Sequence, residues 1–182
     1  MGLSELSGQH LRACAGFSSV VARGEGRWDR PSPCPEWDAR GLVEHVIGFH
    51  DVLVLRPLGA KPKRPKGDPV PRWELTHEAL STLLHEYGEL LPDSPVDLPG
   101  LLPALRTEVL VHTWDLATAL GVDAHLDEEL CAIALRGALG HEAEYRASGM
   151  FSASVAVSEG ASVTDRLVAL LGRDPGWRRS TP

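Results

Sequence analysis

The sequence predicts an all-α protein built as a helical bundle. Five segments repeat apolar residues at the three- and four-residue spacing of one helix face, and the alternation typical of strands is almost absent. The chain has 182 residues, which suits one domain and is long enough to bury a core without disulfides or metals. Its composition, 43% hydrophobic and 24% charged, is that of a folded globular domain. We therefore expect a single helical domain over residues 1–182.

The first two helices are expected over residues 3–23 and from Asp38 onward. Gly24 is suited to end the first helix. Three prolines between Trp28 and Trp37 then hold the chain in extended and turn conformations. Asp38 is a suitable N-cap for the second helix. The apolar stripe of that helix contains Leu42, His45, Val46, Phe49 and Leu53.

The third and fourth helices are expected over residues 73–91 and 103–120. The proline-rich loop between the second and third helices, residues 59–71, holds all three lysines of the chain and is long enough to cross over the bundle. Pro103 suits the first turn of the fourth helix, and Gly121 suits its C-terminal end.

In the last part of the chain, the residue pattern predicts a fifth helix over residues 127–147 and a shorter final helix. Residues 151–157 alternate weakly in hydrophobicity and are expected to form a short extended edge. Thr164 is the expected N-cap of the last helix, which ends at Gly172.

Charge and cysteine content limit the partners that this protein can have. The formal net charge of −7 argues against a binder of nucleic-acid phosphates. The longest wholly apolar run, Leu130–Leu135, is far too short to span a bilayer, and Met1–His10 lacks the pattern of a signal peptide. Three scattered cysteines without a Cys-x-x-Cys motif fit reduced thiols. We expect a cytoplasmic monomer or homodimer that binds neither nucleic acid nor membrane.

Charged residues interrupt the apolar stripes of two expected helices. Glu108 and His112 lie one turn apart on the stripe of the fourth helix, and His45 lies on that of the second. A buried carboxylate is costly unless it is paired or bound to a metal. Two imidazoles and a carboxylate suit a divalent metal such as zinc, and three protein ligands leave one position open for catalysis. The alternative is an exposed Glu108–His112 pair, with His45 bonded to a carbonyl in the core.

Asp115 lies three residues after His112 on the same face and has two possible roles. It orients a ligand histidine by bonding the ring nitrogen that does not bind the metal, or it bonds to a backbone group or an arginine. In a structural metal site it is also the candidate fourth ligand.

Other reactive side chains have simpler explanations. We expect Cys34 to be a packed, unreactive thiol, and Trp37 and Trp114 to be packing residues. Arg173 is expected to pair with Asp174 or Asp165. His50 is expected to be solvated or to cap its helix. Four further histidines are expected at the surface, and they are His77, His85, His125 and His141.

Four motifs occur in a specific order along nearly the whole chain: Pro33–Trp37, Leu42–Val46, Glu108–Ala117 and Asp165–Pro175. Together they resemble the metal-binding proteins related to the N-terminal domain of mycothiol-dependent maleylpyruvate isomerase, in the DinB-like superfamily. The resemblance implies a DinB-like four-helix bundle with an additional short C-terminal helix. It also implies a divalent metal, zinc or another transition metal such as nickel, on His45, Glu108 and His112.

The resemblance further implies a zinc-dependent transferase or isomerase that activates a low-molecular-weight thiol such as mycothiol toward an electrophilic substrate. A metal-bound thiol loses its proton and becomes a nucleophile at neutral pH. The sequence ends soon after the expected bundle and lacks the separate C-terminal domain of the isomerase, so fold and metal are carried over more readily than the isomerase reaction. The alternative is a non-catalytic metal-binding or interaction protein with a structural or sensing metal.

Overall fold

A computed structural model describes residues 2–86, 94–147 and 151–178 of the chain. Over these residues the secondary structure is helical apart from an isolated antiparallel bridge between Pro31 and Asp38, so the predicted all-α class is confirmed. The helices are α1 (Leu3–Val21), α2 (Ala39–His50), the π-helical turn η1 (Asp51–Leu55), α3 (Pro69–Glu86), α4 (Leu98–Leu120), α5 (Glu128–Ala138), α6 (Glu142–Ala147) and α7 (Val163–Leu170).

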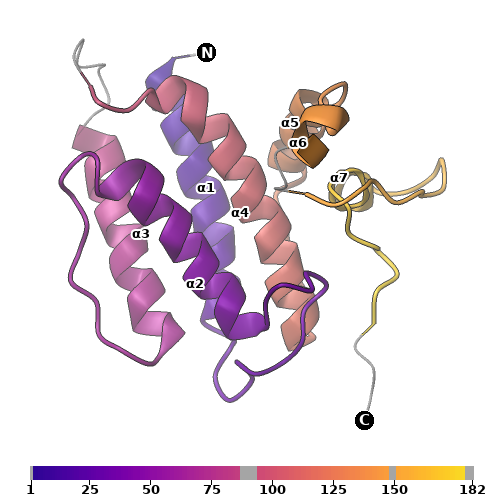
Figure 1. Cartoon of the computed structure of the whole chain (residues 1–182), viewed down its shortest axis with the longest axis horizontal. Coiled ribbons are helices and arrows are strands. Elements are labelled where there is room, and N and C mark those ends of the chain that lie inside the picture. Colours follow the sequence, from indigo (N-terminus) through magenta and orange to yellow (C-terminus); the bar gives the residue numbers. More distant parts are fainter. Residues whose placement is uncertain (1, 87–93, 148–150, 179–182) are drawn as a thin grey trace.

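Helices α1 to α4 form a four-helix bundle (Figure 1). Each of α1 and α2 packs against both α3 and α4. The loop over residues 56–68 returns along the length of the bundle, so α2 and α3 point in the same direction (Figure 1). The proline-rich loop is therefore a crossover, as its length suggested.

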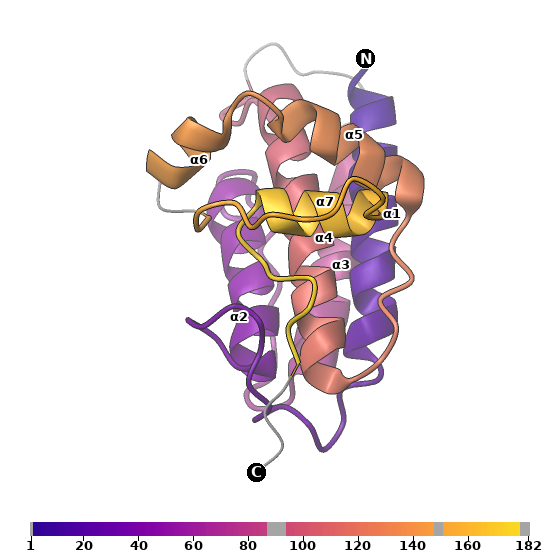
Figure 2. The ribbon, with the colours of Figure 1, turned by 90° about the vertical axis from the view of Figure 1, so that its right-hand side faces the viewer.

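A second group of helices lies outside the bundle. Figure 2 shows α5, α6 and α7 beside α4, and α5 and α7 each pack against α4 and against one another. Arg12 of α1 also holds this group, because its guanidinium forms ion pairs with Asp127 at 2.9 Å and with Glu129 at 2.7 Å. The face of α4 turned away from the bundle core is thereby covered, which explains why most of that helix is buried.

Prolines extend two helices beyond their predicted starts. Helix α3 begins at Pro69 rather than at residue 73, since a proline in the first turn has no N–H that the helix needs. Helix α4 begins at Leu98 rather than at residue 103, because the Asp97 side chain accepts a hydrogen bond from the backbone N–H of Gly100. Pro103 consequently lies inside the helix. Tyr87 and Leu91 of the expected third helix lie outside the described residues.

The C-terminal third departs from the prediction in three places. The expected helix over 127–147 is divided into α5 and α6, because Gly140 adopts a φ of +87° that ends the helical path. Helix α7 is capped by Ser162 rather than Thr164, since the Ser162 hydroxyl accepts a hydrogen bond from the backbone N–H of Asp165. Residues 151–157 form no strand; a backbone hydrogen bond from Val155 to Ala169 attaches this segment to α7.

The bundle core is apolar and contains one large aromatic contact. Phe17 of α1 and Trp73 of α3 meet edge to face with their ring centroids 4.8 Å apart, and the indole N–H of Trp73 donates to the Ser18 hydroxyl. None of the helices in the described residues is long and apolar enough to cross a membrane.

Candidate metal centre

The structure brings His45, Glu108 and His112 together between α2 and α4. Their ligand atoms all lie within 4.8 Å of one another, and a Glu108 carboxylate oxygen is 3.2 Å from Nε2 of His112. Glu108 and His112 project from successive turns of α4, and α2 packs against this face of α4. The three residues that the sequence predicted as ligands therefore share one site.

The position of the His45 ring is set by aromatic neighbours. Trp37 stacks on it with the centroids 4.0 Å apart and the planes 20° from parallel, and the edge of Phe49 lies on its other side. Burial, together with the neighbouring His112, lowers the pKa of His45 to about 4. The ring is therefore neutral at physiological pH, which is the state in which an imidazole binds a metal.

The opposite side of His112 is held by an ion pair. Nδ1 of His112 lies 3.1 Å from the Asp115 carboxylate, which also accepts three hydrogen bonds from the Arg173 guanidinium. Burial disfavours a charge on His112, but the bonds to Asp115 and Glu108 outweigh burial and raise its pKa. Asp115 thus faces the nitrogen of His112 that is turned away from Glu108.

Both roles that the sequence left open for Asp115 are present at once, since it contacts a ligand histidine and bonds an arginine. The prediction that Arg173 pairs with Asp174 or Asp165 is wrong. The chain turns back toward α4 at Gly172, where φ is +83° and an added Cβ would lie 2.7 Å from the Ser152 side chain. That turn directs Arg173 into the buried side of the protein, where its side chain is 5% exposed.

A small pocket lies directly beside the three ligand residues. It has a volume of about 220 Å³ and is lined by Trp37, His45, Phe49, Leu53, Leu105, Glu108 and His112. Trp37 therefore both packs on a ligand residue and lines the pocket, whereas Trp114 lines a different hollow near α5 and α7. Apart from the three ligand residues, the pocket lining is apolar or aromatic.

The donor set fits a divalent transition metal. Glu108 is 7% exposed, and its ion-pair partner in the described residues is an imidazole rather than a lysine or arginine. A buried carboxylate beside two imidazoles is typical of zinc and similar ions, and three protein ligands beside a pocket leave a coordination position open. A metal-ligating histidine usually bonds a carboxylate or carbonyl through its second ring nitrogen, and Nδ1 of His112 bonds Asp115 in this way.

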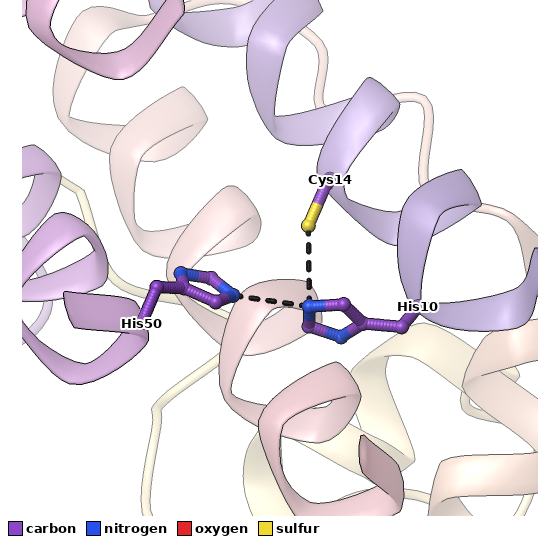
Figure 3. A group of neighbouring side chains, drawn as sticks. All are labelled: His10, Cys14 and His50. Carbon is purple, nitrogen blue, oxygen red and sulfur yellow. Dashed lines mark hydrogen bonds between the residues drawn. The ribbon is translucent and has the colours of Figure 1, made fainter. Parts of the chain in front are cut away.

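A second cluster of ligand-type side chains lies in the bundle core, and the sequence pattern does not predict it. His10 and Cys14 of α1 meet His50 of α2, with ligand atoms within 4.8 Å of one another (Figure 3). The expectation that His50 is solvated or caps the helix is wrong, because its side chain is fully buried. The i, i+4 spacing of His10 and Cys14 on the buried stripe of α1 was the available signal.

The other reactive residues are not part of either cluster. His85, His125 and His141 are exposed as expected, whereas His77 is half-buried and stacks on Trp73. Cys34 is buried, its thiol donates to Glu36, and burial raises its pKa to about 12. It is therefore unsuited to act as a nucleophile, in agreement with the prediction.

The fold and this site define the class of protein, a DinB-like helical bundle with a candidate metal centre between two of its helices. Residues 10–86 match the family of the mycothiol maleylpyruvate isomerase N-terminal domain. The chain belongs to that family. This match includes His45 but ends before Glu108 and His112, which α4 supplies.

The relatives extend the similarity to nearly the whole chain. The uncharacterized protein MT0763 of Mycobacterium tuberculosis (strain CDC 1551 / Oshkosh) is 30% identical over 181 residues, which cover 90% of this chain and 95% of the relative. The uncharacterized protein Rv0738 of Mycobacterium tuberculosis (strain ATCC 25618 / H37Rv) has the same identity and coverage. No solved structure matches the chain.

Proposed function

We propose that this protein is a divalent-metal-dependent enzyme that activates a low-molecular-weight thiol, such as mycothiol, toward an electrophilic substrate. The observation that carries the proposal is the position of the pocket. Glu108, His45 and His112 present their ligand atoms to a hollow of about 220 Å³, which has room for the thiol end of such a molecule beside a metal. Membership of the isomerase family supports the choice of thiol.

Each residue of the site has a role in this proposal. His45, Glu108 and His112 would hold the metal. Zinc is the first ion to test, because the set is two nitrogens and one carboxylate oxygen. When bound, the ion favours the deprotonated form of a coordinated thiol. Asp115 fixes the orientation of His112 through Nδ1, and Arg173 keeps the Asp115 carboxylate in place.

The pocket walls restrict what the protein binds beside the metal. Phe49, Leu53 and Leu105 give one side of the pocket an apolar surface, which suits the uncharged part of an electrophile. The proposed substrates are therefore small molecules, and the reaction is a thiol transfer or a thiol-dependent isomerisation.

The geometry favours this function over a purely structural metal. A structural site is closed by a fourth protein ligand, and Asp115 was the candidate for it. Its carboxylate instead faces Nδ1 of His112 and the guanidinium of Arg173, away from the nitrogen beside Glu108.

The experiment is a thiol titration of the cobalt-substituted protein. It is performed in a Cys14→Ser background, so that the only thiol beside histidines in the described core is removed. Mycothiol should produce a thiolate-to-cobalt charge-transfer band and release a proton, and S-methylated mycothiol should do neither. The same titration of the His112→Ala variant should give no band. If no low-molecular-weight thiol alters the spectrum at millimolar levels, the thiol-activating function is wrong.

A further inference from the structure

We propose that His10, Cys14 and His50 form a second metal site, distinct from the pocket-lining one, and that it binds copper in the monovalent state. Figure 3 shows the three side chains converging from α1 and α2. The inference is independent of the proposed function, because the two sites share no residue.

The distances suit one bound ion. Nε2 of His10 lies 3.0 Å from Nε2 of His50 and 3.5 Å from the Cys14 sulfur. Two nitrogen or sulfur ligands of a single transition-metal ion, each about 2.0–2.3 Å from it, lie about 3.3–3.7 Å apart. Small side-chain adjustments would therefore place the three donor atoms around one ion.

The hydrogen bonds of His50 direct its Nε2 toward the other two donor atoms. Nδ1 of His50 donates to the backbone carbonyl of Val46 at 2.7 Å, which leaves the lone pair of Nε2 directed toward His10 and Cys14. A backbone carbonyl on the far nitrogen is a common partner of metal-ligating histidines. The three donor atoms thus face one another, with the protonated nitrogen of His50 turned away.

Hydrogen bonding alone accounts poorly for His10. Its side chain is fully buried, and Nδ1 has no hydrogen-bond partner. Leaving a buried polar atom unpaired costs about 1–3 kcal/mol. The mutual hydrogen bond of the two histidines returns only about 0.5–1.5 kcal/mol against this cost, and a metal bond to Nε2 would compensate for more of it.

The charges of the cluster select the ion. His10, Cys14 and His50 are all 0% exposed, and the Cys14 thiolate is the single anionic ligand they can supply. Cu(I) and one thiolate are neutral together, whereas Zn(II) would leave a positive charge in the core, near Arg106 and His77. The nearby buried carboxylate, Asp51, is already bonded to Arg64.

Ligand chemistry leads to the same ion. Thiolate and imidazole are ligands that Cu(I) accepts readily, and three ligands are sufficient for it, so a fully enclosed site needs neither a fourth residue nor water. The pocket-lining site differs on both counts, since it has a carboxylate in place of the thiolate and an open side. The two clusters are therefore suited to different metals.

The test is X-ray absorption at the copper edge on protein loaded anaerobically with Cu(I) and ascorbate. One sample is loaded in the native state and a second is refolded from urea with Cu(I) present, so that a closed core does not prevent loading. We expect one copper per chain with one sulfur and two nitrogen neighbours. This sulfur signal identifies the site, because the other cluster contains only nitrogen and oxygen donors.

Variants separate this site from other thiols. Cys14→Ser and Cys14→Ala should lose the sulfur neighbour and release copper to the chelator bicinchoninate, with the helical circular dichroism spectrum retained. Cys131→Ser is the matched control, because it removes another fully buried thiol and should retain the copper. Glu108→Gln should retain it as well. Absence of a copper–sulfur bond in both wild-type samples would overturn the proposal, and zinc displacing the bound Cu(I) would overturn the choice of ion.

Discussion

The imidazole of His112 has a different partner at each nitrogen. Nε2 faces the Glu108 carboxylate and Nδ1 faces Asp115, which is fully buried and bonded to Arg173. Such a chain of contacts positions one ring more tightly than packing alone, because a rotation of the ring would break both bonds. Arg173 lies 58 residues beyond Asp115, so the end of the chain takes part in positioning a residue of the candidate centre.

The contribution of Asp115 can be separated from that of its ion pair. We expect Asp115→Asn to weaken metal binding by about 10–100-fold, since Asn is a poorer partner for Nδ1 of His112. It should also destabilise the fold, because Arg173 is left buried and unpaired. The measurements are a metal competition titration and urea unfolding.

The double variant Asp115→Asn/Arg173→Gln is the control. It removes the unpaired charge, so much of the stability should return while metal binding stays weak. If both properties recovered together, Asp115 would act only through the fold.

His77 provides a residue-scale prediction on pH. Burial lowers its pKa below the usual value of about 6.5 that it has in the unfolded chain. As the pH falls, the unfolded state therefore takes up this proton first, and stability is lost below about pH 6.5 until the folded pKa is reached. Urea midpoints of the wild type should fall more steeply from pH 7 to pH 5 than those of His77→Gln. Equal slopes for the two proteins would contradict the assignment.

At the scale of elements, the sequence predicted which helices exist better than where they begin. Hydrophobic periodicity and the caps Asp38 and Gly121 located the bundle helices correctly. The pattern assigns Pro69 to the preceding loop and Pro103 to a first turn, yet Pro69 lies in the first turn of α3 and Pro103 lies inside α4, whose start is fixed by Asp97. Local rules rank several possible starts similarly, and tertiary packing decides among them.

The same limit applies to the sites. His45, Glu108 and His112 could be predicted because each breaks an apolar stripe on its own helix. The burial of His50 depends on the neighbouring helix α1, which supplies His10, so the pattern of its own helix does not predict it. A site made between two helices is visible from sequence only when each helix carries its own anomaly.

The cap of α7 gives a prediction with a built-in comparison. Ser162→Ala should reduce the free energy of unfolding by about 1 kcal/mol, since it removes the acceptor for the backbone N–H of Asp165. Thr164→Ala should have a smaller effect, because the Thr164 hydroxyl donates a long hydrogen bond to the Cys131 sulfur, at 3.8 Å, rather than accepting one from the first turn of the helix. Urea unfolding of both variants measures the difference. A larger loss for Thr164→Ala would restore Thr164 as the cap.

At the scale of the whole molecule, most of the core packing involves neither cluster. The bundle packs around Phe17, Trp73 and many aliphatic side chains, and α5 and α7 cover α4 from outside. His45 and Glu108 lie at the edge of this core beside a pocket, rather than at its centre. A metal there joins α2 to α4, two helices that already pack against one another.

Removal of the divalent metal should therefore lower the melting temperature without unfolding the protein. A ligand present at 100 times its dissociation constant adds about 2.7 kcal/mol to stability. For a chain of this length, that corresponds to a loss of roughly 5–10 °C on chelation. Calorimetry of the metal-loaded and chelated protein measures the change, and His45→Ala, which lacks one ligand, should respond little to the chelator. A chelated wild type without a cooperative transition would show that the metal holds the fold together, as in small zinc domains, and would favour a structural role over a catalytic one.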